Sequence, residues 1–258
     1  MLLAIDVGNT NIVIGVFDGA TLVESWRLQT LRERTADEVG LLLIGLFQHR
    51  RVDIAVVEAI SMGSVVPVLT PIMRTMVKRY FGRDPFVVEP AVNAGMPILY
   101  ERPTEVGADR IANAVAGFEQ YGRARGLPLV IADLGTATTF DAVTAKGEYL
   151  GGVICPGPQI AADALFQRAA RLPRVDVRRP PNVIGRNTIN AVESGLFYGY
   201  VGMVDGLMRR IVDELGGRAI GIATGGLAPL VLPELTTFEA HEPDITLHGL
   251  RLIWERNR

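Results

Sequence analysis

An acidic turn occurs once in each half of the chain, and this repeat constrains the fold more than any other feature. The sequence D-V-G-N-T-N starts at Asp6 after an apolar run, and D-L-G-T-A-T-T starts at Asp133 after a second apolar run. The two aspartates are 127 positions apart in a chain of 258 residues. Repetition at about half the chain length indicates two similar structural units. We therefore expect an N-terminal lobe over residues 1–122 and a C-terminal lobe over residues 123–258.

Each acidic turn joins two β-type runs, which is the pattern of a β-hairpin. In the first copy, residues 2–5 and 12–17 flank a turn with a glycine, Gly8, and polar side chains. Glycine lets a backbone approach a ligand closely, and turn amides that point one way form a nest for anionic oxygens. Asp6 would then face a phosphate-bound Mg²⁺, a cation that prefers oxygen ligands. An ordinary Asn–Gly hairpin, with Asp6 bonding only turn amides, is the alternative.

The elements predicted between the acidic turns are those of an α/β protein. The first half shows three strands, a helix that begins with a capping box at Thr35, a strand over residues 54–60 that ends at residues 61–67, a helix over 67–80 and a short strand. The second half shows its hairpin, a turn-rich crossing at residues 151–157, two helices separated by an arginine-rich loop, and further strands. We expect a C-terminal helix over residues 245–255. The duplicated order is β-β-β-α-β-α, and the active site is expected in a cleft between the lobes.

Composition excludes several classes of protein. A hydrophobic content of 48% and a charged content of 21% are typical of a globular protein, and a net charge of −2 gives no reason to expect nucleic-acid binding. Cys155 is the single cysteine, which excludes an internal disulfide and, with three scattered histidines, argues against zinc. We see neither a membrane span nor a signal peptide, and we expect a cytoplasmic protein.

Lysine is rare, and this restricts how phosphate could be bound. Lys78 and Lys146 are the only lysines, and neither stands in a G-x-x-x-x-G-K-[ST] sequence. No G-x-G-x-x-G follows a predicted strand, so P-loop and Rossmann sites are disfavoured. Phosphate binding would have to use backbone amides, hydroxyl groups and a metal ion.

The sequence G-A-D-R, residues 107–110, stands where a helix is predicted to begin after a loop-like stretch at 89–106. Asp109 could accept a hydroxyl proton, and Arg110 could bind anionic oxygens. The alternative for Asp109 is an ordinary acid in a first helical turn, where the helix dipole favours it.

The second acidic turn raises a question of charge. If Asp133 faces phosphates, its negative charge needs a counter-ion, and a bound cation would supply one. Thr136, Thr138 and Thr139 offer hydroxyls, although β-propensity alone explains the last two. The turn at residues 224–226, T-G-G, would let a ring or ribose approach the backbone, or it is a plain strand–helix turn.

Two features of the C-terminal half are not part of these turns. The loop over residues 171–187 carries five arginines and is either a solvated loop or a contact for an anion or a partner. The helix predicted over residues 188–215 has glycines spaced along one face, where another backbone could pack closely. That backbone would belong to the same chain or to a second subunit. The stripe consists of Gly195, Gly199, Gly202 and Gly206.

Five motifs together resemble those of a known family. D-V-G-N-T-N, G-A-D-R, D-L-G-T-A-T-T, G-G-V-I-C-P-G and T-G-G-L-A occur in the order and approximate spacing seen in type III pantothenate kinases. That family belongs to the acetate/sugar kinase, Hsp70 and actin superfamily, whose fold consists of duplicated ribonuclease-H-like lobes. The resemblance implies ATP-dependent phosphorylation of pantothenate, the first step towards coenzyme A.

The resemblance also implies roles for individual residues. The ATP-binding residues would be Asp6, Val7, Gly8, Asn9, Thr10, Asn11, Ile12, Val13 and Thr136. The pantothenate site would consist of Tyr100, Gly107, Ala108, Asp109, Arg110 and Thr188. Asp109 would be the general base, and Asp133 would bind a monovalent cation, potassium or ammonium, alongside Mg²⁺ on the nucleotide. The family further implies a homodimer in which Thr188 completes the site of the other subunit.

Two rival functions remain open at this point. One is a kinase of the same superfamily that acts on a sugar or a carboxylate, because such enzymes also place an aspartate near a hydroxyl. The other is a non-catalytic, nucleotide-binding regulatory protein. Asp109 argues against the second, since binding alone needs no base.

Overall fold

The computed structural model describes residues 1–89, 94–169 and 172–258. The chain divides into two compact units, residues 1–116 with 244–258 and residues 117–243. The predicted loops at 89–106 and 171–187 each include positions outside the described ranges. The units differ from the predicted lobes mainly at the C-terminus, which belongs to the first unit. The reason is packing: Leu247 and Leu250 of the last helix are buried and reach the strands of the first sheet at Gly15 and Gly63.

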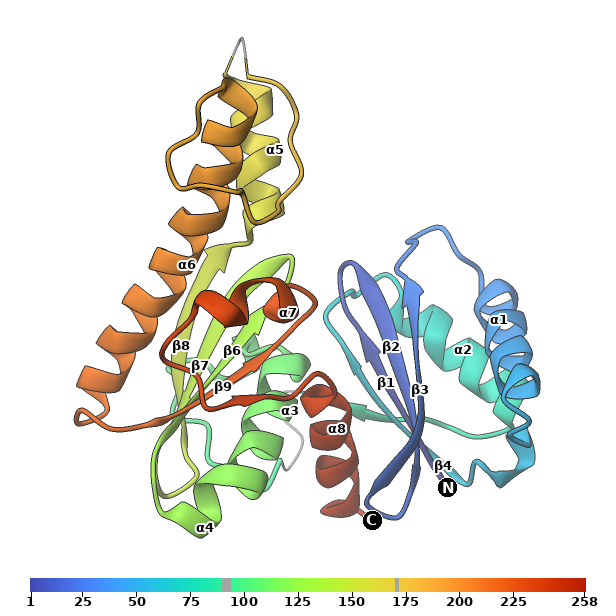
Figure 1. Cartoon of the computed structure of the whole chain (residues 1–258). Helices are drawn as coiled ribbons and strands as arrows, with labels where there is room; N and C mark the ends of the chain where they lie inside the picture. The colour runs from blue at the N-terminus through green and yellow to red at the C-terminus, as the bar shows by residue number, and fades with distance from the viewer. Residues whose placement is uncertain (90–93, 170–171) are drawn as a thin grey trace. The chain divides into compact units, whose positions relative to one another are not determined.

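The first unit contains a five-stranded sheet in the order β3-β2-β1-β4-β5. Strands β1, β2 and β3 form an antiparallel meander, and β4 and β5 run parallel to β1. One face packs against α1 and α2, and α8 lies against the sheet as well (Figure 1). The elements are β1 (Leu2–Val7), β2 (Asn11–Asp18), β3 (Thr21–Gln29), α1 (Ala36–His49), β4 (Ala59–Ser64), α2 (Thr70–Phe81), β5 (Phe86–Val88), α3 (Ala108–Gly117) and α8 (Ile245–Glu255).

The second unit repeats this topology with a sheet in the order β10-β9-β6-β7-β8. Strands β6, β7 and β8 form the antiparallel meander, and β9 and β10 continue in parallel from β6. Its elements are a π-helical turn (Phe118–Gly122), α4 (Arg123–Arg125), β6 (Leu129–Leu134), β7 (Ala137–Val143), β8 (Tyr149–Pro156), α5 (Pro158–Arg168), α6 (Thr188–Glu214), β9 (Ile220–Thr224), α7 (Ala228–Val231) and β10 (Ala240–His241). The predicted duplication of an α/β unit is therefore confirmed.

Local signals placed several helix ends correctly. The capping box at Thr35 is present, because its side chain accepts from the Glu38 amide while the Glu38 carboxylate accepts from the Thr35 amide. Gly82 ends α2 with a left-handed backbone, φ 65°. Gly122 ends a π-helical turn with helical backbone angles, and the residue with a left-handed backbone is Gly126, φ 60°.

Two segments that were predicted to lie outside strands are strands: the strand predicted over residues 54–60 is displaced to residues 59–64, and the crossing predicted as turn-rich at 151–157 is mostly strand. Residues 61–64 belong to β4, where Gly63 pairs with Asp6 of β1. A Cβ on Gly63 would lie 3.0 Å from a methyl group of Leu250, so the glycine admits a close neighbour. Residues 151–156 belong to β8, whose register with β7 shifts next to Gly151.

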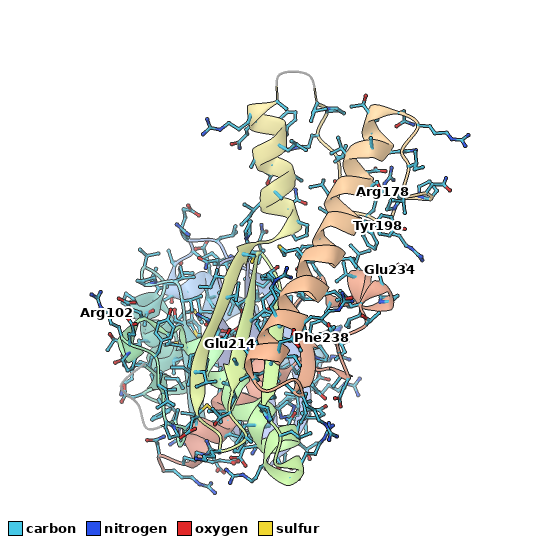
Figure 2. All side chains as sticks on the ribbon, turned by 90° about the vertical axis from the view of Figure 1, so that its left-hand side faces the viewer. Arg102, Arg178, Tyr198, Glu214, Glu234 and Phe238 are labelled. Atoms are coloured by element: carbon cyan, nitrogen blue, oxygen red, sulfur yellow. The ribbon has the colours of Figure 1, made fainter. Side chains whose placement is uncertain are left out.

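Helix α6 is the longest element, and its two ends pack against different parts of the second unit. Its middle and C-terminal part packs on the second sheet through a row of buried side chains, Phe197, Tyr200, Val204 and Met208. Its N-terminal part extends beyond the sheet beside α5 (Figures 1 and 2). Among the described residues, none of the helices combines the length and apolar character needed to span a membrane.

Candidate functional site

The first acidic hairpin is a tight turn at the end of β1. The Gly8 N–H donates to the Asn11 carbonyl at 3.0 Å, and Val7 pairs with Ile12 across the ladder. A Cβ on Gly8 would lie only 3.0 Å from that same carbonyl oxygen, which favours glycine at this position. Asp6 is half-buried at the strand end, and the tip residues Asn9 and Thr10 are exposed. The tip of the hairpin therefore exposes the polar residues Asn9 and Thr10.

The G-A-D-R segment is seated on the ends of the strands that carry this hairpin. The Val65 amide donates to the Val7 carbonyl at 3.0 Å, which fixes the end of β4 beside the turn. A Cβ on Gly107 would lie 3.4 Å from Val65, and one on Gly63 would lie 3.4 Å from the Cβ of Ala108. Glycines at both positions thus allow the start of α3 to approach β1 and β4. Residues far apart in sequence, the first hairpin and G-A-D-R, meet at one end of this sheet.

Asp109 occupies the first turn of α3 and is half-buried. Its Oδ1 accepts from the Arg110 amide at 2.8 Å. Burial raises the pKa of Asp109 above its usual value of 3.8, and the Arg110 amide and charge oppose that rise. Any side chain on Gly107 would place its Cβ 2.5 Å from this carboxylate oxygen. A carboxylate with a raised pKa that is held in place by its neighbours suits proton abstraction.

A pocket of about 440 Å³ adjoins the G-A-D-R segment in the first unit. Its polar lining includes Ser64, Thr70, Thr104 and Glu105, and Gly107 forms part of its wall. Tyr100, which the family resemblance assigns to the substrate site, is half-buried and does not line this pocket. Gly107 and Ala108, the two residues that precede Asp109, both line this pocket.

The second acidic hairpin has a shorter turn than the first. The Gly135 N–H donates to the Ala137 carbonyl at 3.1 Å, and Leu134 pairs with Thr138, so one residue fewer lies in the turn. Asp133 is half-buried at the end of β6. A Cβ on Gly225, which has φ +92°, would collide with Oδ1 of Asp133. The T-G-G turn after β9 therefore lies directly against the Asp133 carboxylate.

The threonines of this hairpin have different environments. Thr136 is exposed at the tip, and its carbonyl accepts from the Gly157 amide at 3.0 Å. Thr138 is fully buried and its hydroxyl bonds the Tyr200 hydroxyl at 2.6 Å, so it supports the hairpin from the α6 side. Burial raises the pKa of Tyr200 to about 12. Thr139 pairs with Asp133 in the ladder. Thr136 is exposed and Thr139 is half-buried on the same sheet face as Asp133, whereas the buried Thr138 cannot reach a ligand.

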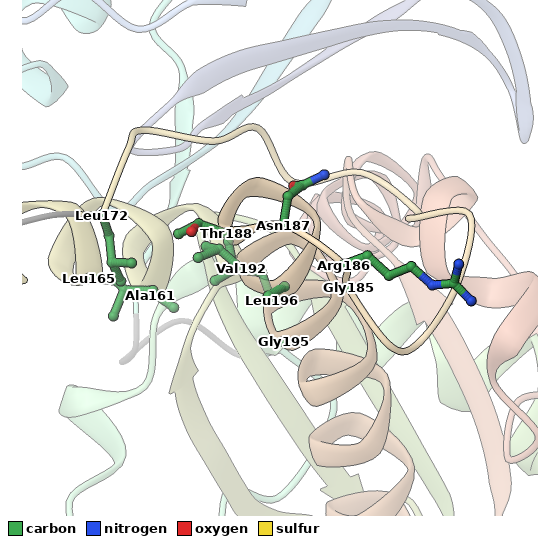
Figure 3. A pocket seen from close by; sticks show the side chains of 11 residues that line it. Ala161, Leu165, Leu172, Gly185, Arg186, Asn187, Thr188, Val192, Gly195 and Leu196 are labelled. Carbon is green, nitrogen blue, oxygen red and sulfur yellow. The ribbon is translucent and has the colours of Figure 1, made fainter.

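Thr188 stands at the other end of the second unit's long helix. It is the first residue of α6 and lines a pocket of about 840 Å³ between α5 and the loop that precedes α6 (Figure 3). Tyr200 bonds the Asp133 hairpin twelve residues further along the helix, which at a rise of 1.5 Å per residue is roughly 18 Å. Within its own unit, Thr188 is therefore distant from Asp133.

The arginine-rich loop is pinned by ion pairs. Arg174 pairs with Asp163, Arg178 with Glu193 and Arg179 with Glu234, at 3.5, 2.7 and 2.5 Å. Figure 2 labels Arg178 and Glu234 beside α6. Three of the predicted cationic side chains are thus engaged within the unit, Arg186 lines the larger pocket, and Arg171 lies outside the described residues.

Two residues of this site had no motif to identify them. Thr30 bonds the first hairpin from the residue after β3, and Tyr200 bonds the second from α6. The only signal for Thr30 was its position just beyond a predicted strand. In the part of the chain that the structure describes, no group of three or more His, Cys, Asp or Glu side chains is arranged to hold a metal.

Two sheets of the same topology, each with an acidic hairpin after its first strand, define a duplicated α/β fold of the sugar-kinase and actin type. Solved structures with this fold include the inorganic polyphosphate/ATP-glucomannokinase from Arthrobacter sp. strain KM, with a TM-score of 0.53, 16% identity, and coverage of 100% of this chain and 99% of that one. The ROK hexokinase from Thermus thermophilus matches with a TM-score of 0.52, 16% identity, and coverage of 100% and 99%.

Sequence comparison identifies the family within this fold. The family model described as type III pantothenate kinase matches residues 2–210. The type III pantothenate kinase of Moorella thermoacetica is 51% identical over 257 residues, covering 100% of both chains. That of Pelobacter propionicus is 53% identical over 258 residues, again covering 100% of both. The chain belongs to the type III pantothenate kinase family.

Proposed function

We propose that this protein transfers the γ-phosphoryl group of ATP to pantothenate and forms 4'-phosphopantothenate, the first step of coenzyme A biosynthesis. Family membership over most of the chain supports this reaction. The structural observation that carries the proposal is the seating of G-A-D-R on the strand ends that bear the first acidic hairpin. A candidate base and a candidate phosphate loop are thereby parts of one rigid framework.

Asp109 is proposed as the general base. Its carboxylate would take the proton of the pantothenate hydroxyl as that oxygen bonds to the γ-phosphorus and the bond to the β–γ bridging oxygen breaks, releasing ADP. The raised pKa of Asp109 makes it a stronger base than an exposed aspartate. Arg110, with its side chain largely buried beside Asp109, would help to hold the acidic substrate.

The ATP contacts are assigned to the two hairpins. The first hairpin would bind phosphates through its turn amides and polar side chains, with Thr136 of the second as a further contact. The residues of the first set are Asp6, Val7, Gly8, Asn9, Thr10, Asn11, Ile12 and Val13. The pantothenate contacts proposed are Tyr100, Gly107, Ala108, Asp109 and Arg110, with Thr188 supplied by a second subunit.

Two cations are proposed to bind at the carboxylates at the strand ends. Asp6 is a half-buried oxygen donor beside the phosphate hairpin, which suits Mg²⁺ that keeps phosphate and water ligands as well. Asp133 is a second half-buried carboxylate, and the backbone at Gly225 lies against it, which suits a potassium or ammonium ion. When bound, these ions would offset the negative charge of the phosphates.

The assignment of Asp133 predicts a dependence on monovalent cations. Initial rates should be high in potassium or ammonium chloride and low in sodium chloride at equal ionic strength. Asp133→Ala should lower the rate by roughly 10- to 100-fold, the loss expected for a charged interaction of 1.5–3 kcal/mol, and should abolish the difference between the salts. Equal wild-type rates in sodium and potassium would contradict this assignment.

A homodimer is proposed because one face of α6 is open and its surroundings are apolar. No described residue would lie within 4 Å of a Cβ added at Gly195, Gly199 or Gly202. Ile184, in the loop before α6, is 81% exposed, and this loop lies against the helix because the Ser194 hydroxyl donates to the Val183 carbonyl. A second copy packed on this part of α6 could cover Ile184 and bring Thr188 to its partner's site.

The reaction is tested by a coupled assay for ADP release from purified protein, with and without pantothenate. Glucose and acetate serve as alternative acceptors, because sugar and carboxylate kinases share the fold. We expect ADP release only with pantothenate and a product of the mass of 4'-phosphopantothenate. ATP binding without turnover would favour a regulatory protein, and turnover with glucose or acetate would favour the other kinases.

A further inference from the structure

We propose that Thr30 is a positioning residue for ATP: its hydroxyl fixes the Gly8 carbonyl and thereby aims the Asn9 amide at a phosphate oxygen. The proposal rests on the proposed role of the first hairpin in binding ATP. Thr30 lies outside the D-V-G-N-T-N motif and immediately after β3, which ends at Gln29.

Thr30 makes two hydrogen bonds to the hairpin turn. Its Oγ1 donates to the Gly8 carbonyl at 2.7 Å, and its amide donates to the Thr10 carbonyl at 2.9 Å. The Gly8 amide in turn donates to the Asn11 carbonyl at 3.0 Å. The turn is therefore held on both sides, across its own base and from the neighbouring strand.

The bond to the Gly8 carbonyl sets the direction of the next amide. A trans peptide unit is planar, and its C=O and N–H point in opposite directions. With the Gly8 oxygen turned towards Thr30, the Asn9 N–H must point away from Thr30. Glycine has unusual backbone freedom, so this peptide unit is the one in the turn that most needs an external constraint. A donor fixed before the ligand arrives binds an anionic oxygen without the cost of reorientation.

The second hairpin provides an internal comparison. Gly157 occupies the position equivalent to Thr30, because Gln29 pairs with Asn11 and Pro156 pairs with Ala137. The Gly157 amide donates to the Thr136 carbonyl at 3.0 Å, as the Thr30 amide does to Thr10. A Cβ at Gly157 would collide with the Thr136 oxygen and would lie 2.5 Å from the Gly135 oxygen. The backbone bond is thus common to both hairpins, whereas the hydroxyl bond belongs only to the hairpin assigned to the phosphates.

Variants at Thr30 separate this role from a merely structural one. Thr30→Val removes the hydroxyl and keeps the shape of the side chain. Thr30→Ser keeps the hydroxyl and removes the methyl group, and Thr30→Ala removes both. Thr75→Val is the matched control, because the Thr75 hydroxyl also donates to a backbone carbonyl, that of Pro71, at 3.0 Å on α2 of the same unit. Each full-length variant is titrated with ATP and Mg²⁺ by calorimetry, and KM is measured for both substrates.

We expect Thr30→Val and Thr30→Ala to raise the Kd for ATP by roughly 3- to 10-fold, the range for one neutral hydrogen bond, and to leave KM for pantothenate unchanged. Thr30→Ser and Thr75→Val should bind ATP like the wild type. In amide NMR spectra, addition of ATP should shift the Asn9 resonance strongly in the wild type and weakly in Thr30→Val.

Three results would overturn the proposal: wild-type ATP affinity in both hydroxyl-free variants, loss of affinity in Thr30→Ser equal to that in Thr30→Val, or equal rises in both KM values. If Thr30→Val does not fold, Thr30→Ala and Thr30→Ser still decide the matter. Failure of the wild type to phosphorylate pantothenate would refute the proposed reaction instead, and the ATP titrations would still test Thr30.

Discussion

At the scale of single residues, the proposed chemistry depends on one half-buried acid, Asp109. Asp109→Asn keeps the size and hydrogen-bonding capacity of the side chain but removes its basicity. Loss of a general base typically lowers the rate by about 10²–10⁴-fold, so we expect kcat to fall by that factor while ATP affinity is retained. Steady-state kinetics and calorimetry measure the two quantities. A variant with near wild-type turnover would exclude Asp109 as the base.

The same substitution should change how stability and activity depend on pH. Because burial raises the pKa of Asp109, the folded state holds this proton to a higher pH than the unfolded state, whose value is about 3.8. Between these two values the folded state binds more protons, so ionisation lowers stability as pH rises. Asp109→Asn should therefore melt at a higher temperature than the wild type at pH 7, with the difference lost below about pH 3.8. The wild-type rate should fall as pH drops through the raised pKa.

The motifs predicted those residues whose chemistry is local in sequence. Asp6, Gly8 and Gly107 are identifiable because an acid or glycine at a strand or helix end has few roles. Thr30 and Tyr200 could not be identified from a motif, since Thr30 bonds a residue 22 positions away and Tyr200 bonds a residue 62 positions away. The strand register brings Thr30 to the first hairpin, and the packing of α6 on the second sheet brings Tyr200 to the second. Sequence periodicity alone does not contain that register.

At the scale of elements, the span of α8 could be predicted from the sequence, whereas its packing partners could not. Its span over residues 245–255 was predicted correctly from its apolar pattern. Its partners were not, because the helix returns from the end of the chain to the first unit. There the Thr246 hydroxyl donates to Asn113 of α3 at 2.7 Å, and the Ser61 hydroxyl donates to the Leu250 carbonyl at 2.9 Å. The helix thus braces α3 and β4, the two elements that position G-A-D-R.

Gly249→Ala tests this bracing. A Cβ at Gly249 would collide with the backbone of Ala112 in α3, which cannot move like a flexible side chain. We expect a loss of about 1–3 kcal/mol in the free energy of unfolding, the usual effect of overpacking, as measured by urea denaturation. Gly45→Ala on α1 is the control, because no described residue lies within 4 Å of the added Cβ, and it should gain about 0.5–1 kcal/mol. Equal stability of the two variants would show that α8 and α3 are loosely packed.

At the scale of the whole molecule, duplication has produced two hairpins that are alike in topology and different in detail. The first turn is one residue longer and is clamped by a threonine hydroxyl, whereas the second is shorter and lies against the glycines at positions 157 and 225. The repeat in the sequence predicted the shared topology, because the apolar strands recur with it. It could not predict the difference, which comes from residues outside both motifs.

The open glycine face of α6 is the expected contact between two subunits. Glycines inside a helix cost roughly 0.5–1 kcal/mol each relative to alanine, so Gly195, Gly199 and Gly202 together cost about 1.5–3 kcal/mol that no described contact within the chain offsets. A second copy packed on this face would offset it through close backbone contact. Gly199→Leu should block that approach, shift the protein towards monomer in sedimentation velocity, and lower activity in proportion to the lost dimer, since Thr188 could no longer complete the partner's site. Gly45→Leu, at an equally open position on α1, should remain dimeric and active. A fully active Gly199→Leu dimer would exclude this face as the subunit contact, and an active wild-type monomer at assay concentration would exclude the shared site.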